Sequence, residues 1–318
     1  MSNVWKKLKK DLNSKPIMVL APMANVTDSP FRRIVAKCGK PDIFFNEFIS
    51  CDGLFSSGRD KLLKFLRFTS VERPLIVQFF GSRPDNFYKC AQLAQEFGFD
   101  GIDINMGCPD RSVEKQGGGA ALIKNPKLAQ EIIKETKRGA GSLSVSVKTR
   151  LGYNKIEIKE WIPRILEMDI EALSVHGRTR KEMSSVPAHW DYLGEIAEMV
   201  HGSNALIIGN GDVVDLADAY SKADTYGLDG IMIGRGIFKN LWFFNKKQKI
   251  ISPKEKIKIL KKHLELFSQF WGEDQNFDVM KKFFKVYING WPGANDLRAR
   301  LMNTKIKKDA ESIIDSIF

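Results

Sequence analysis

Eight short apolar runs, separated by longer amphipathic stretches, constrain the fold of this chain more than any other feature. The runs are three to five residues long and lie at 17–20, 43–45, 75–79, 101–104, 144–148, 172–175, 206–208 and 230–233. Between most of them, apolar residues recur three and four positions apart, at 29–38, 84–97, 126–138, 156–168, 192–200 and 214–220. Strands that alternate with helices in this way predict a (β/α)8 TIM barrel, and continuously apolar strands suit a parallel sheet buried on both faces.

The alternation stops after residue 233. Further helices are expected at 254–271, 279–288, 295–303 and 308–317, and one at 61–68 within the irregular connection 51–74. We therefore predict a basic N-terminal lead-in (1–16), a TIM-barrel domain (17–243) and a small α-helical C-terminal domain (244–318). An open doubly wound sheet is the alternative fold. It is disfavoured because there are eight strands and no G-x-G-x-x-G follows the first.

The positive charge of the chain is concentrated at its two ends. The net charge is +12, of which residues 1–15 carry +4 and residues 239–318 carry +8, while the segment between them is neutral. A neutral body with basic ends indicates a polyanionic partner that contacts the ends. A solubilising, lysine-rich surface is the alternative interpretation of the same charges.

The cysteines argue against a metal centre and against export. Cys38, Cys51, Cys90 and Cys108 lie far apart without a C-x-x-C pair, so no zinc or iron–sulfur site is expected. Few, widely spaced cysteines are typical of proteins in the reducing cytoplasm. The chain has no 18-residue apolar span and no signal-type segment, so we expect a cytoplasmic protein that does not enter membranes.

Polar residues or glycine turns follow seven of the eight predicted strands, and a Pro-Met pair follows the first. In a barrel, the residues just beyond the C-terminal ends of the strands face the active site. Cys108 is one of them, although an isolated cysteine is more often a small buried hydrophobe. The glycine run 117–119 comes soon after it, and glycines without Cβ let a backbone lie close to a ligand. The polar strand-end residues are Asn46, Glu47, Gln78, Asn105, Lys148, Arg150, His176, Arg178, Arg180, Asn210, Asp212 and Arg235.

The glycine turns 209–211 and 234–236 each lead toward a helix and predict a phosphate site, because such turns present backbone N–H groups. Lys148 ends an apolar strand and needs an anionic or acceptor partner, which the N1–C2=O edge of a flavin would supply. Gln78 could pair with the pyrimidine edge of the same ring. Lys148 could instead pair with Glu47 or Asp103, and Gln78 with backbone. His176 could be an ordinary core histidine, but the sequence after it suggests an exposed functional loop.

Six ordered motifs resemble the tRNA-dihydrouridine synthase family. They are 21–28 (APMANVTD), 105–109 (NMGCP), 147–150 (VKTR), 176–179 (HGRT), 209–212 (GNGD) and 234–236 (GRG). The resemblance covers about residues 17–240, and a weaker one continues through 287–294 (YINGWPGA). Asn25 departs from the pattern, because a glycine is common at this position in the family. The lysine-rich second domain matches the family less closely, which leaves the modified uridine open.

The resemblance implies an FMN enzyme that reduces the C5–C6 bond of selected tRNA uridines with NADPH or NADH. Hydride would pass from flavin N5 to C6, and Cys108 would give a proton to C5. A thiol of ordinary pKa is mostly protonated at neutral pH, which suits this acid. Asn105 and Arg178 would orient the uracil. The implied cofactor-binding residues are Pro22, Met23, Ala24, Gln78, Lys148, His176, Asn210, Gly211, Asp212, Gly234 and Arg235.

A base must leave its stack to reach a barrel mouth, so basic side chains of the helical domain are expected to hold the tRNA backbone. Arg298, Arg300, Lys305 and Lys307 are candidates, and the protein is expected to be a monomer without metal. Two other functions stay open because fold alone does not decide function. One is an FMN barrel acting on a small molecule, such as a dihydroorotate dehydrogenase or an ene-reductase. The other is a tRNA-binding module without catalysis.

Overall fold

The eight predicted strands form a closed parallel barrel in the computed structural model, which describes residues 3–247 and 250–317. Each strand pairs in parallel with its neighbours, and the pairing of β2 with β4 completes the ring. The predicted (β/α)8 barrel is therefore confirmed. The strands are β1 (Ile17–Leu20), β2 (Ile43–Phe45), β4 (Leu75–Phe80), β5 (Gly101–Asn105), β6 (Ser144–Arg150), β7 (Ala172–His176), β8 (Leu206–Asn210) and β9 (Gly230–Ile233).

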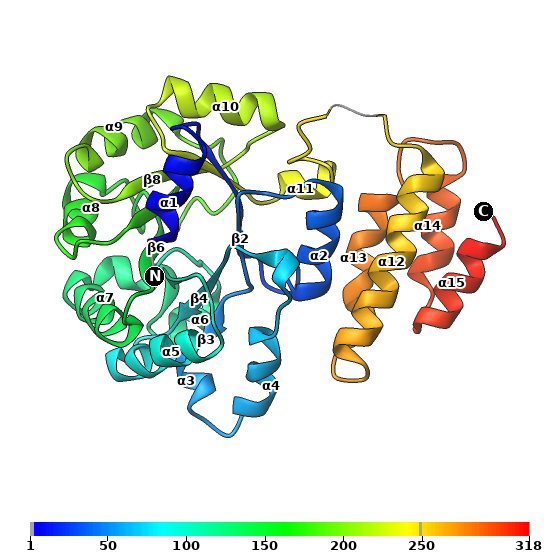
Figure 1. The fold of residues 1–318 in the computed structure, drawn as a ribbon, viewed down its shortest axis with the longest axis horizontal. Coiled ribbons are helices and arrows are strands. Elements are labelled where there is room, and N and C mark those ends of the chain that lie inside the picture. The colour runs from blue at the N-terminus through cyan, green and yellow to red at the C-terminus, as the bar shows by residue number, and fades with distance from the viewer. Residues whose placement is uncertain (1–2, 248–249, 318) are drawn as a thin grey trace.

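A ninth strand, β3 (Ile49–Ser50), follows β2 and pairs in parallel with the C-terminal end of β4; it was not predicted. Helices cover the outside of the barrel, as Figure 1 shows. They are α2 (Ser29–Cys38), α5 (Pro84–Glu96), α7 (Pro126–Ala140), α8 (Ile158–Leu166), α9 (Trp190–Val200) and α10 (Leu216–Thr225). Three of them begin at a side-chain cap that satisfies a free N–H group, supplied by Asp28, Asn125 and Asp215.

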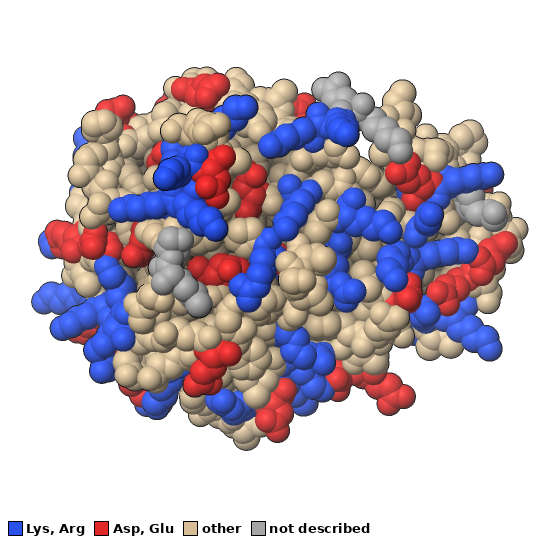
Figure 2. Space-filling model, in the orientation of Figure 1, with Lys and Arg blue, Asp and Glu red and all other residues tan. Residues whose placement is uncertain are grey.

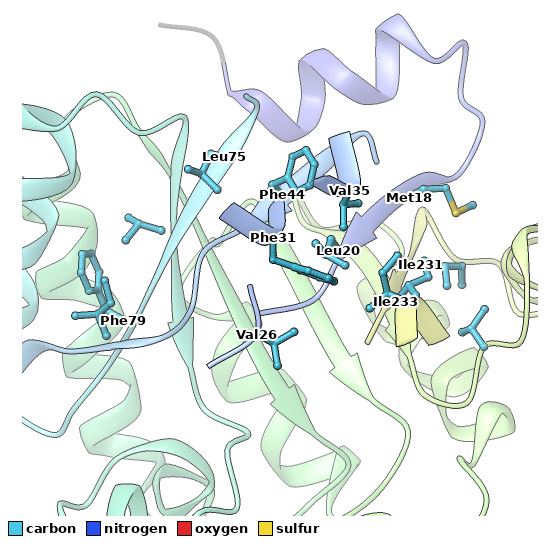
Figure 3. Close-up of a cluster of buried hydrophobic side chains, with 14 of the residues drawn as sticks. Met18, Leu20, Val26, Phe31, Val35, Phe44, Leu75, Phe79, Ile231 and Ile233 are labelled. Carbon is cyan, nitrogen blue, oxygen red and sulfur yellow. The ribbon is translucent and has the colours of Figure 1, made fainter. Parts of the chain in front are cut away.

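Shorter helices lie in the connections. They are α3 (Cys51–Leu54), α4 (Arg59–Leu63), α6 (Arg111–Lys115), α11 (Gly236–Lys239) and the 3-10 segments η1 (Lys64–Leu66), η2 (Ser70–Glu72) and η3 (Gly119–Lys124). The helix predicted at 61–68 is thus divided between α4 and η1. The main apolar core lies between the strands and the covering helices, where Leu20, Phe31 and Phe44 are completely buried (Figure 3).

The basic lead-in forms helix α1 (Val4–Asp11), which closes one end of the barrel. Trp5 is completely buried in a separate core cluster with Ile17, Val19 and Phe45, and its ring centroid lies 6.3 Å from that of Phe45. Because Ile17 begins β1, α1 covers the N-terminal ends of the strands, away from the rim where an active site is expected. Figure 2 shows this face of the molecule. Lysine and arginine side chains are spread over it, from the region of α1 to the C-terminal helices.

The C-terminal helices are α12 (Pro253–Trp271), α13 (Asp278–Tyr287), α14 (Ala294–Met302) and α15 (Lys307–Asp315), and they lie beside α2 and α11 (Figure 1). All four were predicted. Trp271 Nε1 donates to Asp28 Oδ2 at 2.8 Å, and Lys282 Nζ donates to the carbonyl oxygen of Asn25 at 2.8 Å. The helices therefore hold the segment that follows β1. None of the described helices is long and apolar enough to cross a membrane.

Candidate active site

The C-terminal ends of the strands surround a cavity of ≈ 710 Å³. Parallel pairing places Asn105 level with Lys148 and, one layer nearer the rim, places Arg150, His176 and Asn210 level with one another, so side chains from four strands gather at this end of the barrel. The cavity wall comes from β6 to β9 and from the segments after β1 and β5. Nine of the predicted cofactor-binding residues line it: Pro22, Met23, Lys148, His176, Asn210, Gly211, Asp212, Gly234 and Arg235.

Lys148 brings a cation to the floor of the cavity. Burial, together with the charge of Arg150, lowers the pKa of its ammonium to about 8. Its Nζ donates to Asn210 Oδ1 at 3.3 Å, and Asn210 Nδ2 donates to the carbonyl oxygen of Met232 at 2.7 Å. An ammonium has three hydrogens to donate, so Lys148 can still bind an acceptor that enters the cavity.

His176 is held by Arg178. Arg178 Nη1 lies 3.0 Å from His176 Nε2, and a guanidinium cannot accept a hydrogen bond, so Nε2 is the acceptor and the ring proton is on Nδ1. Burial and the charges of Arg150, Lys148 and Arg178 hold the pKa of His176 well below its usual value, so the ring is neutral. Arg178 also pairs with Asp212, and its Nε donates to the carbonyl oxygen of Val186 at 2.6 Å.

Residues 105–109, here called the thiol loop, carry a half-buried Cys108. Burial raises the pKa of the Cys108 thiol, although Arg150 and Lys148 oppose this, so the sulfur keeps its proton at neutral pH. Asn105 Oδ1 accepts from the backbone N–H of Cys108 at 2.9 Å and of Gly107 at 3.2 Å. Pro109 lines the cavity, which places the thiol loop at its edge.

Five predicted site residues do not line the cavity: Ala24, Gln78, Asn105, Cys108 and Arg178. Ala24 is exposed, whereas Arg178 is buried behind the wall and occupied by His176 and Asp212. Gln78 is completely buried, and its amide is bonded to the side chains of Asp103 and Asn105 rather than to backbone.

The glycine run 117–119 does not contact the cavity, which corrects our expectation that it approaches a ligand. A Cβ on Gly119 would lie 2.7 Å from the carbonyl oxygen of Cys108, and one on Gly118 would lie 2.9 Å from that of Gly81. The glycines are therefore required by close packing of the backbone against the protein itself.

The two glycine turns line the cavity as predicted, but the helices after them differ from the expectation. Helix α11 is a single turn of four residues, and α10 begins only at Leu216, where Asp215 caps its first turn. These turns therefore present loop N–H groups and nearby cations to the cavity rather than helix ends. Arg235 and Lys239 supply such cations at the wall.

Arg150 and Lys239 also line the cavity; our prediction placed Arg150 among the strand-end residues without giving it a role, and it did not name Lys239. The sequence did carry a signal for Arg150, because residues two apart on a strand share a face and Lys148 had been assigned. Arg150 Nε donates to the carbonyl oxygen of Gly107 at 2.6 Å, which ties β6 to the thiol loop. No signal pointed to Lys239. Within residues 3–247 and 250–317, no group of three or more His, Cys, Asp or Glu could hold a metal ion.

Comparison with known proteins agrees with the motifs. The sequence model of the family described as "Dihydrouridine synthase (Dus)" matches residues 19–317. The chain belongs to the dihydrouridine synthase family. A Bacillus subtilis (strain 168) protein named "Probable tRNA-dihydrouridine synthase 2" is 42% identical over 318 residues, covering 98% of this chain and 96% of the relative. The "Probable tRNA-dihydrouridine synthase" of Staphylococcus aureus (strain COL) is 41% identical, covering 98% and 95%.

Solved structures of other enzymes share the architecture of this dihydrouridine synthase family member. A 2-naphthoyl-CoA reductase complex superposes with a TM-score of 0.57 at 12% identity, covering 72% of this chain and 49% of that chain. At such low identity the similarity concerns the barrel fold alone. The family predicted from the six motifs is confirmed by the family match and by the two curated relatives.

Proposed function

We propose that this dihydrouridine synthase family member reduces the C5–C6 bond of uridines in tRNA, with FMN bound in the cavity and NADPH or NADH as electron donor. The observation that carries the proposal is the meeting of a protonated thiol, a partly bonded ammonium and a neutral imidazole at one rim. Such a set can hold an electron-rich ring and deliver a proton beside it. Family membership supports the same chemistry.

The cavity fits a flavin nucleotide in size and donor set. Its volume of ≈ 710 Å³ lies within the usual range for cofactor-sized ligands. Lys148 would contact the N1/O2 edge, and His176 would lie beside the ring. Pro22, Met23 and Ala24 would flank the ring. The phosphate would lie among Asn210, Gly211, Asp212, Gly234 and Arg235, with Lys239 adding a charge.

When bound, FMN would supply the two electrons of the reduction. Cys108 supplies the proton, because burial keeps its thiol protonated at neutral pH. Lys148 and Arg150 place positive charge near the thiol loop, where it stabilises negative charge that develops on a uracil carbonyl. Asn105 keeps one amide hydrogen for the base. Arg178 orients His176 and Asp212, and through them the base and the phosphate.

The tRNA contact belongs on the helical domain (244–318), since α1 of the lead-in covers the opposite end of the barrel from the cavity. Of the four candidates, Lys305 is exposed, whereas Arg298 Nη1 donates to the carbonyl oxygen of Ile288 at 2.6 Å. Lys307 pairs with Glu311 at 3.3 Å, and Arg300 Nη2 bonds Ser316 Oγ at 3.3 Å. The exposed side chain of Lys305 is the best placed to meet a phosphate.

Detection of dihydrouridine in tRNA is a direct test of the proposed function. An unmodified tRNA transcript is incubated with purified protein, FMN and either NADPH or NADH, and its nucleosides are analysed by mass spectrometry for dihydrouridine. We expect dihydrouridine at defined positions. Cys108→Ala is expected to bind FMN and to be reduced by the nicotinamide, yet to turn over tRNA slowly. An FMN-loaded protein that reduces small enones or dihydroorotate but never tRNA would refute the proposal.

We further infer a cytoplasmic monomer that needs no metal. All four cysteines are free thiols, as a reducing compartment allows. Light scattering with size-exclusion chromatography measures the mass, and activity after treatment with EDTA tests the metal requirement. A dimer mass, or activity lost with EDTA and restored by a divalent ion, would contradict this inference.

A further inference from the structure

A chain of hydrogen-bonded side chains runs from the barrel interior to the thiol loop. Asp103 lies on β5 opposite Gln78 of β4, and both are completely buried. Gln78 Nε2 donates to Asp103 Oδ2 at 2.7 Å, and Asn105 Nδ2 donates to Gln78 Oε1 at 2.9 Å. Asn105 Oδ1 then accepts from the N–H of Cys108 at 2.9 Å. Asp103 is therefore connected to the backbone of the thiol through two amides.

The donors and acceptors fix the direction of this chain at both ends. A backbone N–H can only donate, so Asn105 must turn its oxygen toward Cys108 and its NH2 group toward Gln78. Gln78 must then offer its oxygen to Asn105 and its NH2 group to Asp103. A carboxylate accepts with both oxygens, which is what this position requires. Turning either amide over would set two donors against each other.

Asp103 acts on the site through its neighbours, among them Lys148, whose charged form its negative charge favours. It does not line the cavity, and its second oxygen accepts from Ser146 Oγ at 2.6 Å. A buried carboxyl without a partner is unfavourable, so a residue of this kind persists where its hydrogen bonds are needed. Burial raises the pKa of Asp103 to about 6, against the hydrogen bonds of Ser146 and Gln78 and the charge of Lys148.

We propose that Asp103 is a positioning residue that orients Gln78 and Asn105 and thereby holds the Cys108 thiol loop in its proton-donating place. The proposal rests on the proposed function, since it assumes that Cys108 is the acid. An enzyme whose Cys108 thiol is displaced by a fraction of an ångström would still bind tRNA. It would transfer the proton to the uracil more slowly. The effect of losing Asp103 therefore belongs in kcat rather than in the KM for tRNA.

The test compares three variants with the FMN-loaded wild type. Asp103→Leu keeps the branching of the side chain but accepts no hydrogen bond. Asp103→Asn can rescue, because its oxygen can accept from Gln78 while its NH2 group meets Ser146 Oγ, which can donate to the carbonyl oxygen of Ile102 at 3.3 Å instead. Ser146→Ala is the matched control that removes the other bond of the carboxylate and leaves the chain intact.

Three rates are measured for each variant: reduction of bound flavin by the nicotinamide, its reoxidation by tRNA, and alkylation of Cys108 by iodoacetamide. The buried Cys38, Cys51 and Cys90 serve as internal references in the alkylation. Asp103→Leu should lower kcat for tRNA about tenfold, leave KM within about twofold and speed alkylation of Cys108. Flavin reduction should be unchanged. Asp103→Asn and Ser146→Ala should resemble the wild type.

Wild-type kcat and alkylation in Asp103→Leu would overturn the proposal, as would equal defects in the Leu and Asn variants. If Asp103→Leu does not fold, Asp103→Ala removes the same acceptor without added volume, and the same outcomes apply. A wild-type protein that binds no FMN or leaves tRNA unreduced would refute the proposed function instead. The two failures are therefore distinguishable.

Discussion

Glu47 offers a test of the junction between the barrel and the helical domain. It follows β2, is only 5% exposed, and lies near Asp28 and Lys282. Burial, and then the negative charge of Asp28, raises the pKa of its carboxyl from 4.5 to about 8. The folded protein thus keeps a proton that the unfolded chain has already lost over much of this pH interval.

The sign of the effect follows from proton binding. Between about pH 5 and pH 8 the folded state binds more protons than the unfolded state, so stability falls as pH rises. Each tenfold difference in proton affinity corresponds to about 1.4 kcal/mol, so the rise in the pKa sets an upper limit of about 5 kcal/mol. Relaxation around Glu47 and its interaction with Asp28 reduce this limit, and we expect about 1–3 kcal/mol at pH 8.

Glu47→Gln keeps the size and the acceptor oxygen but cannot ionise. We expect the variant and the wild type to unfold at similar urea concentrations at pH 5, and the variant to be the more stable by the stated amount at pH 8. Tryptophan fluorescence follows the unfolding, and Glu273→Gln, at an exposed position just after α12, is the control. A stability difference that is constant with pH, or that grows toward acid, would refute the reasoning.

Three further predictions concern packing and titration. Gly119→Ala should lower the free energy of unfolding by about 1–3 kcal/mol, because the φ of Gly119 is +59° and a Cβ would lie 2.7 Å from the carbonyl oxygen of Cys108. Gly202→Ala is the control: its φ is +86° and no atom lies within 4 Å of a Cβ, so it measures the cost of the backbone conformation alone. Burial lowers the pKa of His263 to about 3, so stability should fall as pH drops below about 6.5. His263→Phe should flatten this dependence in thermal melts at pH 5 and pH 7. Trp271→Phe removes the donor to the buried Asp28 and should cost about 1–3 kcal/mol in urea unfolding.

The architecture could be predicted because it is recorded in local patterns. The strand runs and helices are each specified by residues within about ten positions, so periodicity located all eight barrel strands. Lys148 and His176 could be assigned for the same reason, since strand ends in a barrel must face one rim. Strand β3 escaped because two residues, Ile49 and Ser50, cannot show an alternation.

The sequence could not show which side chains, far apart along the chain, form hydrogen bonds or ion pairs with each other. Gln78 was expected to face a ligand, yet its amide is bonded to Asp103, 25 residues away in sequence. Arg178 was expected at the substrate, yet it pairs with Asp212, 34 residues away. Pattern reasoning places a polar side chain on the correct rim, but only the packed structure shows whether a neighbour already uses its hydrogen bonds.

The helical domain supports one wall of the cavity, although none of its described residues lines it. Pro22 and Met23 form part of the cavity wall, and the chain that continues from them through Asn25 to Asp28 is held by Lys282 and Trp271. Asn25 adopts a left-handed φ of 56°, which a tightly held loop can sustain. The C-terminal helices and the cavity are thus connected through the loop after β1, whose first residues form the wall and whose last residues bond the helices.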